Sequence, residues 1–317
     1  MKKKILVSAP MDFVDIDESI DEDLLIFESL SEVDSMKTLD NKELIFSWIV
    51  SPCPTYLIDK QITSFLPNLR SVVTPSTGTN HIDKQSLESI GIKVYSLRDS
   101  ELYNSILASS EYSFSLILSL IRKIPKASQF PIQGRWRESE DYLRSREVNT
   151  LKLGIVGLGR IGKNVANYAS SMGMDIIYFD PFVLNESYKK IKSIKEIFQT
   201  CDVVLLSPIL NDETEDLITK EVLSNSKKGL LLVNTSRGEI IDENAVADLV
   251  KNNTLGGFAA DVLRGEIDGS WKNSPILELS KKGYNVVVTP HIAGLTFDSE
   301  TKAQNIALHL ASKSIEA

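Results

Sequence analysis

The sequence predicts an α/β protein with two doubly wound parallel-sheet domains. Short apolar runs alternate with segments of helical periodicity along the 317 residues, which is typical of βαβ units. The chain is long enough for two domains with separate cores, and its 42% hydrophobic and 25% charged residues form a globular composition. Disordered and fibrous classes are therefore excluded.

The first domain is expected to contain four strands, each a short apolar run followed by a helical stretch. These runs are Lys4–Ser8, Leu44–Val50, Ser71–Thr74 and Ile92–Tyr95. The next segment, Asn104–Lys123, contains neither glycine nor proline and is expected to form one connecting helix.

Six further apolar runs follow, a number that matches one complete doubly wound sheet. They are Leu153–Val156, Asp175–Phe179, Val203–Ser207, Leu230–Asn234, Gly256–Ala260 and Asn285–Thr289. The 28 residues after Thr289 are too few for a domain of their own. We expect them to pack as a helix on the first domain, which is then discontinuous in sequence.

The charge and the cysteines limit the classes of partner. A net charge of −8 and a pI near 5.1 disfavour nucleic acid and anionic membrane surfaces, so a small molecule is the expected partner. Cys53 and Cys201 lack CxxC spacing, which predicts neither a disulfide framework nor a metal site. The apolar runs near the N-terminus and at Phe114–Ile121 are too short for a signal peptide core or a membrane span. We expect a cytoplasmic protein.

A glycine-rich turn directly follows the run Leu153–Val156. Residues 157–162 read G-x-G-x-x-G, and apolar side chains then recur with helical spacing. In such a turn the glycines allow a tight bend and close approach of a pyrophosphate, which the N-terminus of the helix attracts. The predicted cofactor-binding residues here are Gly157, Gly159, Arg160, Ile161 and Gly162. A ligand-free turn is the alternative.

An acidic residue closes the next strand. Asp180 lies 18 residues after Gly162, where a carboxylate can accept hydrogen bonds from the hydroxyls of an adenosine ribose. The Asp180 carboxylate would repel a 2′-phosphate, and residues 181–183, Pro-Phe-Val, contain no basic side chain to offset that repulsion. Asp180 therefore predicts NAD rather than NADP.

Ionisable residues also follow the last three apolar runs. Arg237, Glu266 and His291 come shortly after successive runs, and Asp261 directly follows one of them. The carboxyl ends of parallel strands share one edge of the sheet, where ligands bind. These side chains are therefore expected to converge.

Four motifs in this order, GLGRIG, NTSRGEIID, ADVLRGE and VTPHIAG, closely resemble those of the D-isomer-specific 2-hydroxyacid dehydrogenases. The resemblance covers nearly the whole chain. It implies a Rossmann NAD domain at 104–289, inserted into a flavodoxin-like substrate domain at 1–103 and 290–317. It also implies NAD as cofactor and a homodimer formed through the region Asn104–Arg146.

The resemblance implies that Arg237 binds substrate, His291 is the acid/base and Glu266 pairs with that histidine. The chemistry agrees, because reduction of a 2-oxo acid builds negative charge on the carbonyl oxygen, which a protonated imidazole can stabilise and protonate. Asp268 is a competing acid in the Glu266 loop. Asp261 resembles the family residue beside the nicotinamide carboxamide. Two further residues expected to bind the cofactor are Pro208 and Thr235.

On the substrate side, Thr77 and Gly78 resemble the family turn whose backbone N–H groups hold the substrate carboxylate. Residues 50–54, Val-Ser-Pro-Cys-Pro, contain no basic side chain, which weighs against a phosphorylated substrate. The turn at 78–80, Gly-Thr-Asn, nevertheless resembles that of some phosphoglycerate dehydrogenases. Formate dehydrogenases of the same superfamily have Gln in place of Glu266.

These features predict an oxidoreductase that transfers a hydride between NAD(H) and a small D-2-hydroxy acid or 2-oxo acid. Two alternatives stay open: an NAD-sensing regulatory or binding protein of the same fold, and phosphoglycerate dehydrogenase specifically.

Overall fold

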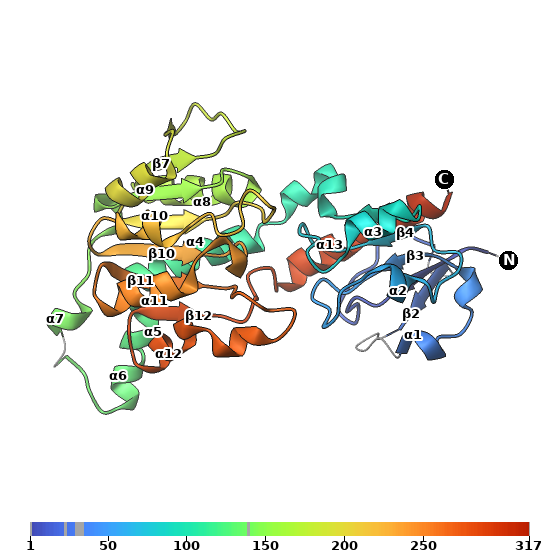
Figure 1. The fold of residues 1–317 in the computed structure, drawn as a ribbon, viewed down its shortest axis with the longest axis horizontal. Helices are drawn as coiled ribbons and strands as arrows, with labels where there is room; N and C mark the ends of the chain where they lie inside the picture. Colours follow the sequence, from blue (N-terminus) through green and yellow to red (C-terminus); the bar gives the residue numbers. More distant parts are fainter. Residues whose placement is uncertain (1, 22–23, 29–34, 138–139, 317) are drawn as a thin grey trace. The chain divides into compact units, whose positions relative to one another are not determined.

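The computed structural model describes residues 2–21, 24–28, 35–137 and 140–316. The chain forms two compact units, one from residues 1–106 with 295–317 and the other from Leu107–Gly294 (Figure 1). Both are built on parallel sheets, as the sequence predicts for an α/β protein. None of the described helices combines the length and the apolar character needed to cross a membrane.

The first unit contains a five-stranded parallel sheet. Its strands are β1 (Lys4–Val7), β2 (Leu25–Phe27), β3 (Ile45–Ile49), β4 (Ser71–Val73) and β5 (Lys93–Tyr95). Their order, β2-β1-β3-β4-β5, is that of flavodoxin-like sheets. The sequence prediction omits β2, because three apolar residues among acidic ones give too short a signal.

Alternating side chains of these strands bury opposite faces of the sheet. Leu6, Trp48 and Val72 pack in a core with side chains of α2 (Lys60–Thr63) and α3 (Lys84–Ser89). Ile5, Val7, Ile49 and Val73 form a second core with the C-terminal helix α13 (Phe297–Glu316). The tail therefore covers the sheet of the first unit as a helix, as predicted. A short helix, α1 (Ser35–Thr38), contributes Met36 to the first of these cores.

The second unit contains a seven-stranded parallel sheet. Its strands are β6 (Lys152–Val156), β7 (Asp175–Phe179), β8 (Lys189–Lys190), β9 (Val203–Leu206), β10 (Leu230–Asn234), β11 (Leu255–Ala260) and β12 (Val286–Val288). They are arranged in the order β12-β11-β10-β9-β6-β7-β8. The chain reverses direction across the sheet at β6, whose neighbours are β7 and β9, and ligands bind at such a switch point in open α/β sheets.

Helices cover both faces of this sheet. One core unites the sheet with α4 (Ala108–Ile121) and α8 (Arg160–Ser171), and the other unites it with α9 (Ile194–Thr200), α10 (Lys220–Ser224), α11 (Glu243–Lys251) and α12 (Pro275–Lys281). Three short helices follow α4 in sequence: α5 (Ile124–Ala127), α6 (Gln129–Ile132) and α7 (Glu140–Leu143).

The connecting helix is shorter than predicted. The sequence analysis expects a helix over Asn104–Lys123, but α4 begins at Ala108, and Glu101–Ser105 forms a separate 3-10 turn. The side chains of Asn104 and Ser105 donate to carbonyls three residues earlier in that turn, so they compete with continuation of an α-helix. At the other end, Lys123 has φ +52°, which stops the helix.

The ten predicted strands are all present, and each end lies within one residue of its predicted position. The prediction omits β8 as well as β2, because β8 is a two-residue edge strand made of lysines. Hydrophobic runs identify the buried strands, whereas an exposed edge strand has no such pattern.

Asp202 ties together segments at the amino ends of β6 and β9. Its carboxylate accepts hydrogen bonds from Lys227 Nζ and Arg146 Nη1, both at 2.8 Å, and from the Lys152 backbone N–H at 3.0 Å. Burial raises the pKa of Asp202, but the three donors together lower it by a larger amount. The pKa of Asp202 therefore lies below its ordinary value of 3.8. Its ionised form is therefore more favourable in the folded state than in the unfolded state.

Replacing Asp202 by asparagine should lower the free energy of unfolding at pH 7 by about 1–3 kcal/mol, because charge-assisted hydrogen bonds are lost. A carboxyl group whose pKa is depressed by folding stabilises the protein above its ordinary pKa, and this effect disappears as pH falls through the folded value. Urea unfolding should therefore show the two proteins converging below about pH 3.8. The control is Asp175→Asn, whose exposed pair with Lys152 should contribute about 0–1 kcal/mol. Equal losses in both variants would contradict this role of Asp202.

Candidate functional site

Three neighbouring strands of the second unit end at the same edge of its sheet. Arg237 follows β10, Asp261 follows β11 and His291 follows β12, and these strands pair in parallel in that order. Glu266 lies in the loop after β11.

Glu266 and His291 are in direct contact. Nδ1 of His291 lies 2.5 Å from Oε2 of Glu266, and each side chain is about one-third exposed (33% and 32%). The other carboxylate oxygen of Glu266 accepts the Leu263 N–H at 2.9 Å, which fixes the orientation of the carboxylate. With Nδ1 engaged by Glu266, Nε2 is the ring nitrogen that can exchange a proton with a ligand.

The surroundings of Glu266 favour its charged form. Burial raises the pKa of Glu266, but four other effects outweigh it: the hydrogen bond and the charge of His291, the Leu263 N–H, and the charge of Arg237. Its pKa therefore lies below the ordinary 4.5, and Glu266 is an anion at neutral pH. The competing acid, Asp268, is exposed and accepts the Ser270 N–H at 2.8 Å. The carboxylate that contacts His291 is thus Glu266.

Gly238 allows the Arg237 turn to approach the loop after β11. A Cβ atom at Gly238 would lie 2.0 Å from both the Leu263 carbonyl carbon and the Arg264 nitrogen, so no larger residue fits. Arg237 is half-buried, and its Nη1 donates to the Ser236 carbonyl at 2.7 Å. This close packing explains why the Arg237 charge acts on Glu266.

The buried carboxylate of Glu243 fixes the loop that contains Glu266. Glu243, at the start of α11, accepts the Arg264 N–H at 2.8 Å and the Ser274 hydroxyl at 2.6 Å. The Arg264 guanidinium in turn reaches the carboxylate of Asp216 and the carbonyl of Glu239. Both ends of the loop are therefore fixed by residues that the sequence analysis does not identify, since an acidic residue in the first turn of a helix is a common feature.

Asp261 is a buried carboxylate that fixes the loop containing His291. It is 1% exposed, and its carboxylate accepts the Thr289 hydroxyl at 2.6 Å, the Ile292 N–H at 3.0 Å and the Ala293 N–H at 2.8 Å. Its carbonyl accepts the His291 N–H at 2.8 Å. His291 has φ +55°, a left-handed conformation that costs a non-glycine residue roughly 1–2 kcal/mol. The hydrogen bonds to Asp261 offset that cost and hold the imidazole opposite Glu266.

The glycine turn after β6 packs tightly against the end of β9. Gly157 has φ +90°, and a Cβ atom there would lie 2.7 Å from the Pro208 nitrogen. Ser207 donates from its hydroxyl to the Gly157 carbonyl at 2.6 Å. At Gly162 a Cβ atom would lie 2.3 Å from that same carbonyl oxygen. Packing within the protein therefore requires glycine at both ends of the motif.

Gly159, the central glycine, is different. It caps the N-terminus of α8 without a side-chain hydrogen bond, and a Cβ atom there would meet no protein atom within 4 Å. Packing does not require glycine here, whereas a phosphate group approaching the backbone would. The first turn of α8 also contains no acidic residue, so its N–H groups and positive dipole end suit an anion. The turn thus fits the pyrophosphate of a dinucleotide.

Asp180, which directly follows β7, also binds the backbone of the glycine turn. It is 8% exposed and accepts the backbone N–H of Leu158 at 2.8 Å and those of Phe182 and Val183 at 2.9 Å each. The sequence analysis assigns Asp180 only to the ribose. The structure adds a second effect, because the same carboxylate links the turn after β6 to the loop after β7.

The remaining predicted cofactor residues line this edge too. Pro208 accepts a hydrogen bond from the Ser236 hydroxyl through its carbonyl, and Thr235 Oγ1 lies 2.7 Å from Ser113 Oγ of α4 in a buried contact. Asn234 Nδ2 donates to the Arg237 carbonyl at 2.9 Å. Sequence analysis misses Ser113 and Asn234, since polar residues inside a helix or at a strand end give no distinct pattern.

Thr77 and Gly78 lie in the first unit, in the turn after β4. The Ser76 hydroxyl donates to the Gly78 carbonyl at 2.6 Å, and Thr74 Oγ1 lies 3.0 Å from both Ser76 Oγ and Nε2 of His81. His81 is buried and supports this turn from within. In the part of the chain that the structure describes, no group of three or more His, Cys, Asp or Glu side chains could hold a metal ion.

Residues 114–293 match the family described as D-isomer specific 2-hydroxyacid dehydrogenase, NAD binding domain. A Haemophilus influenzae protein described as a 2-hydroxyacid dehydrogenase is 33% identical over 244 residues, which cover 75% of each chain. The glyoxylate reductase of Pyrococcus horikoshii is 28% identical over 90% of this chain and 81% of its own length. A D-3-phosphoglycerate dehydrogenase of Bacillus subtilis is 29% identical, but the match spans only 47% of that longer protein.

Solved structures of similar fold cover nearly the whole chain. The D-lactate dehydrogenase of Aquifex aeolicus, crystallised with NAD and lactic acid, has a TM-score of 0.80 at 27% identity, covering 99% of this chain and 96% of that one. A protein of Thermus thermophilus has a TM-score of 0.82 at 24% identity and the same 99% coverage of this chain, which shows a common fold.

Gly159→Ala should weaken NADH binding at least about tenfold without unfolding the protein, because its side chain would occupy only the space left for the phosphates. The stability change should stay within about 1 kcal/mol. Gly157→Ala is the comparison, and it should destabilise the protein because of its positive φ and its contact with Pro208. Fluorescence titration with NADH and thermal unfolding measure both effects. Wild-type NADH affinity in Gly159→Ala would refute the assignment of this turn.

Proposed function

Because this chain belongs to the D-isomer specific 2-hydroxyacid dehydrogenase family, we propose that it transfers a hydride between NAD(H) and a small D-2-hydroxy acid or its 2-oxo acid. The family is the one that the four sequence motifs predict, and its members are NAD-dependent oxidoreductases. The observation that carries the proposal for this chain is the 2.5 Å contact between His291 Nδ1 and Glu266 Oε2.

NAD is the cofactor, in line with the match of residues 114–293 to an NAD binding domain. We propose that Gly157, Gly159 and Gly162 receive the pyrophosphate and that Asp180 accepts hydrogen bonds from the adenosine ribose. We also propose cofactor contacts from Arg160, Ile161, Pro208 and Thr235. For Asp261 we propose a position beside the nicotinamide carboxamide. When bound, NADH supplies the hydride that reduces C2 of the 2-oxo acid.

His291 is the proposed acid/base. Negative charge develops on the carbonyl oxygen during reduction, and a protonated imidazole stabilises this charge and then donates its proton through Nε2. Glu266, an anion at neutral pH, stabilises the imidazolium and fixes the ring through Nδ1.

Arg237 is the proposed substrate-binding cation. Its planar guanidinium can pair with the carboxylate and the carbonyl oxygen of the substrate together. We also propose, from the sequence resemblance, that the backbone N–H groups of Thr77 and Gly78 hold the carboxylate. The three predicted catalytic residues, Arg237, Glu266 and His291, thus divide binding, orientation and proton transfer.

Asp261 is proposed as a positioning residue as well. Its carboxylate holds Thr289, Ile292 and Ala293, and thereby keeps His291 in its left-handed conformation. A cofactor contact by Asp261 is compatible with these bonds, since each carboxylate oxygen can accept more than one hydrogen bond.

We propose a homodimer formed through the region Asn104–Arg146, as the family resemblance implies. Large apolar side chains are exposed there on the isolated chain: Ile132 is 78% exposed and Trp136 is 75% exposed. Exposed apolar groups of this size are typical of surfaces that a partner covers. A cytoplasmic location is also proposed, because Cys53 and Cys201 are not joined in a disulfide, which suits a reducing compartment.

His291→Ala should lower kcat/KM for 2-oxo acid reduction by about 10²- to 10⁴-fold, because proton transfer is lost, while NADH affinity stays within about twofold. Glu266→Gln should lower kcat/KM by a smaller factor than His291→Ala, because the imidazole stays in place but loses the carboxylate that orients it through Nδ1.

The matched control is Asp268→Asn, in the same loop as Glu266 but bonded to Ser270. Its kinetics and pH profile should equal those of the wild type. Unchanged turnover in His291→Ala, or equal effects of the two acidic substitutions, would refute the proposed roles.

A screen of NADH oxidation with glyoxylate, pyruvate, hydroxypyruvate, 3-phosphohydroxypyruvate and longer 2-oxo acids tests the reaction class and selects the substrate. NADH should be preferred over NADPH by at least about tenfold, since Asp180 repels a 2′-phosphate. Preference for the phosphorylated acid would favour the phosphoglycerate dehydrogenase alternative. Tight NADH binding without turnover of any 2-oxo acid would instead favour an NAD-sensing protein.

A further inference from the structure

The turn after β4 contains a hydrogen-bond network that begins at a buried histidine. Thr74 Oγ1 lies 3.0 Å from Nε2 of His81 and 3.0 Å from Ser76 Oγ. Ser76 Oγ lies 2.6 Å from the carbonyl oxygen of Gly78. Thr74 and His81 are both buried. We refer to these four residues as the turn network.

The direction of each hydrogen bond follows from the number of protons available. The Gly78 carbonyl can only accept, so Ser76 donates its single hydroxyl proton to it. Ser76 Oγ must then accept from Thr74, which uses the single hydroxyl proton of Thr74. Thr74 Oγ1 must in turn accept from Nε2 of His81. The geometry therefore requires a proton on Nε2 of His81.

Backbone hydrogen bonds fix both ends of the same turn. The Thr74 N–H donates to the Tyr95 carbonyl at 2.9 Å, and the Ile58 N–H donates to the His81 carbonyl at 2.9 Å. The turn network therefore acts on a segment whose two ends are already held. It sets the orientation of peptide groups between these ends.

The hydrogen bond from Ser76 to Gly78 closes a ring within the turn. This ring contains the two peptide groups that carry the N–H groups of Thr77 and Gly78, so neither peptide group can rotate freely while the bond persists. Among the residues that the structure describes, neither of these N–H groups donates to a protein acceptor. Two successive free N–H groups in a fixed turn can bind an anion.

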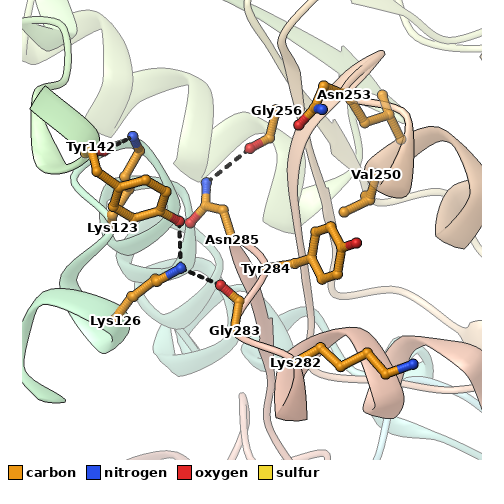
Figure 2. Close-up of a pocket in the computed structure, with 11 residues that line it drawn as sticks. Lys123, Lys126, Tyr142, Val250, Asn253, Gly256, Lys282, Gly283, Tyr284 and Asn285 are labelled. Carbon is orange, nitrogen blue, oxygen red and sulfur yellow. Dashed lines mark hydrogen bonds between the residues drawn. The ribbon is translucent and has the colours of Figure 1, made fainter.

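Groups that attract anions also occur in the second unit, but in a different setting. Lys123, Lys126 and Tyr142 line a pocket there (Figure 2). All three belong to the segment Asn104–Arg146, which we propose as the dimer interface, so a partner subunit is expected to cover them. The turn after β4 lies outside that segment. The proposed dimer therefore leaves the N–H groups of this turn available to a ligand.

We propose that His81, Thr74 and Ser76 are positioning residues for the substrate carboxylate. Each side chain fixes the next, and Ser76 holds the ring that presents the two free N–H groups. Because they act through the backbone of the turn, these residues should determine how tightly the 2-oxo acid binds rather than how fast its oxygen is protonated. This role rests on the proposed reaction and on the proposed binding of the carboxylate by Thr77 and Gly78.

Thr74→Val removes the hydroxyl in the middle of the turn network with a nearly isosteric side chain. It should raise KM for the preferred 2-oxo acid about fivefold, because the turn loses a hydrogen bond that orients its N–H groups. Both kcat and NADH affinity should stay within about twofold of the wild type. Thr74→Ser keeps a hydroxyl group and should restore KM to within about twofold of the wild-type value.

The matched control is Ser71→Ala, at the other end of β4. Ser71 is also buried, and its hydroxyl donates to Ser47 Oγ at 2.7 Å. Its loss should lower thermal stability without changing KM for the 2-oxo acid. An unchanged KM in Thr74→Val, or an equal rise in KM in Thr74→Val and Ser71→Ala, would overturn the proposal.

The protonation of the His81 ring tests the turn network without any substrate. The chain has three histidines, so long-range ¹H–¹⁵N spectra can be assigned by elimination with His291→Ala and His309→Gln. At pH 8, Nε2 of His81 should carry a proton, and an unprotonated Nε2 would overturn the assigned directions. If no 2-oxo acid were turned over, the proposed reaction would be refuted, and the Nε2 proton would still decide whether the turn network exists.

Discussion

The contact between the Glu266 carboxylate and the His291 imidazole depends on two loops that follow neighbouring strands, and each loop is held by a buried carboxylate. Glu243 fixes the loop after β11, and Asp261 fixes the loop after β12. Gly238 then lets the Arg237 turn pack against the first of these loops. Glu243, Asp261 and Gly238 thereby bring Arg237, Glu266 and His291 to one edge of the sheet.

The two ends of the seven-stranded sheet differ in their chemistry. At the carboxyl ends, the open space at Gly159, the α8 N-terminus and the Glu266–His291 pair suit an anionic cofactor and proton transfer. At the amino ends, Asp202 instead joins segments by charge-assisted hydrogen bonds. The parallel arrangement of strands produces this division, since every strand directs its amino end to one side and its carboxyl end to the other.

Strand positions and the main site residues can be predicted from the sequence because each leaves a local pattern. Buried strands are apolar runs, and the glycine motif with Asp180 lies at fixed spacing. The supporting contacts cannot be predicted in this way. Asp180 also holds Leu158, Asp261 also holds the His291 loop, and Glu243 contacts a loop about twenty residues away, so each depends on tertiary packing. The start of the connecting helix at Ala108 instead of Asn104 likewise depends on side-chain hydrogen bonds within one turn.

The proposed chemistry is tested most directly by the configuration of the product. The 2-oxo acid other than glyoxylate that is reduced fastest is incubated with NADH, because reduction of glyoxylate gives an achiral product. The resulting 2-hydroxy acid is separated by chiral chromatography against both enantiomers. Transfer of hydride within a site of this family predicts the D enantiomer in nearly complete excess, with one NADH consumed per molecule formed. Formation of the L enantiomer, or of a racemate, would contradict the account.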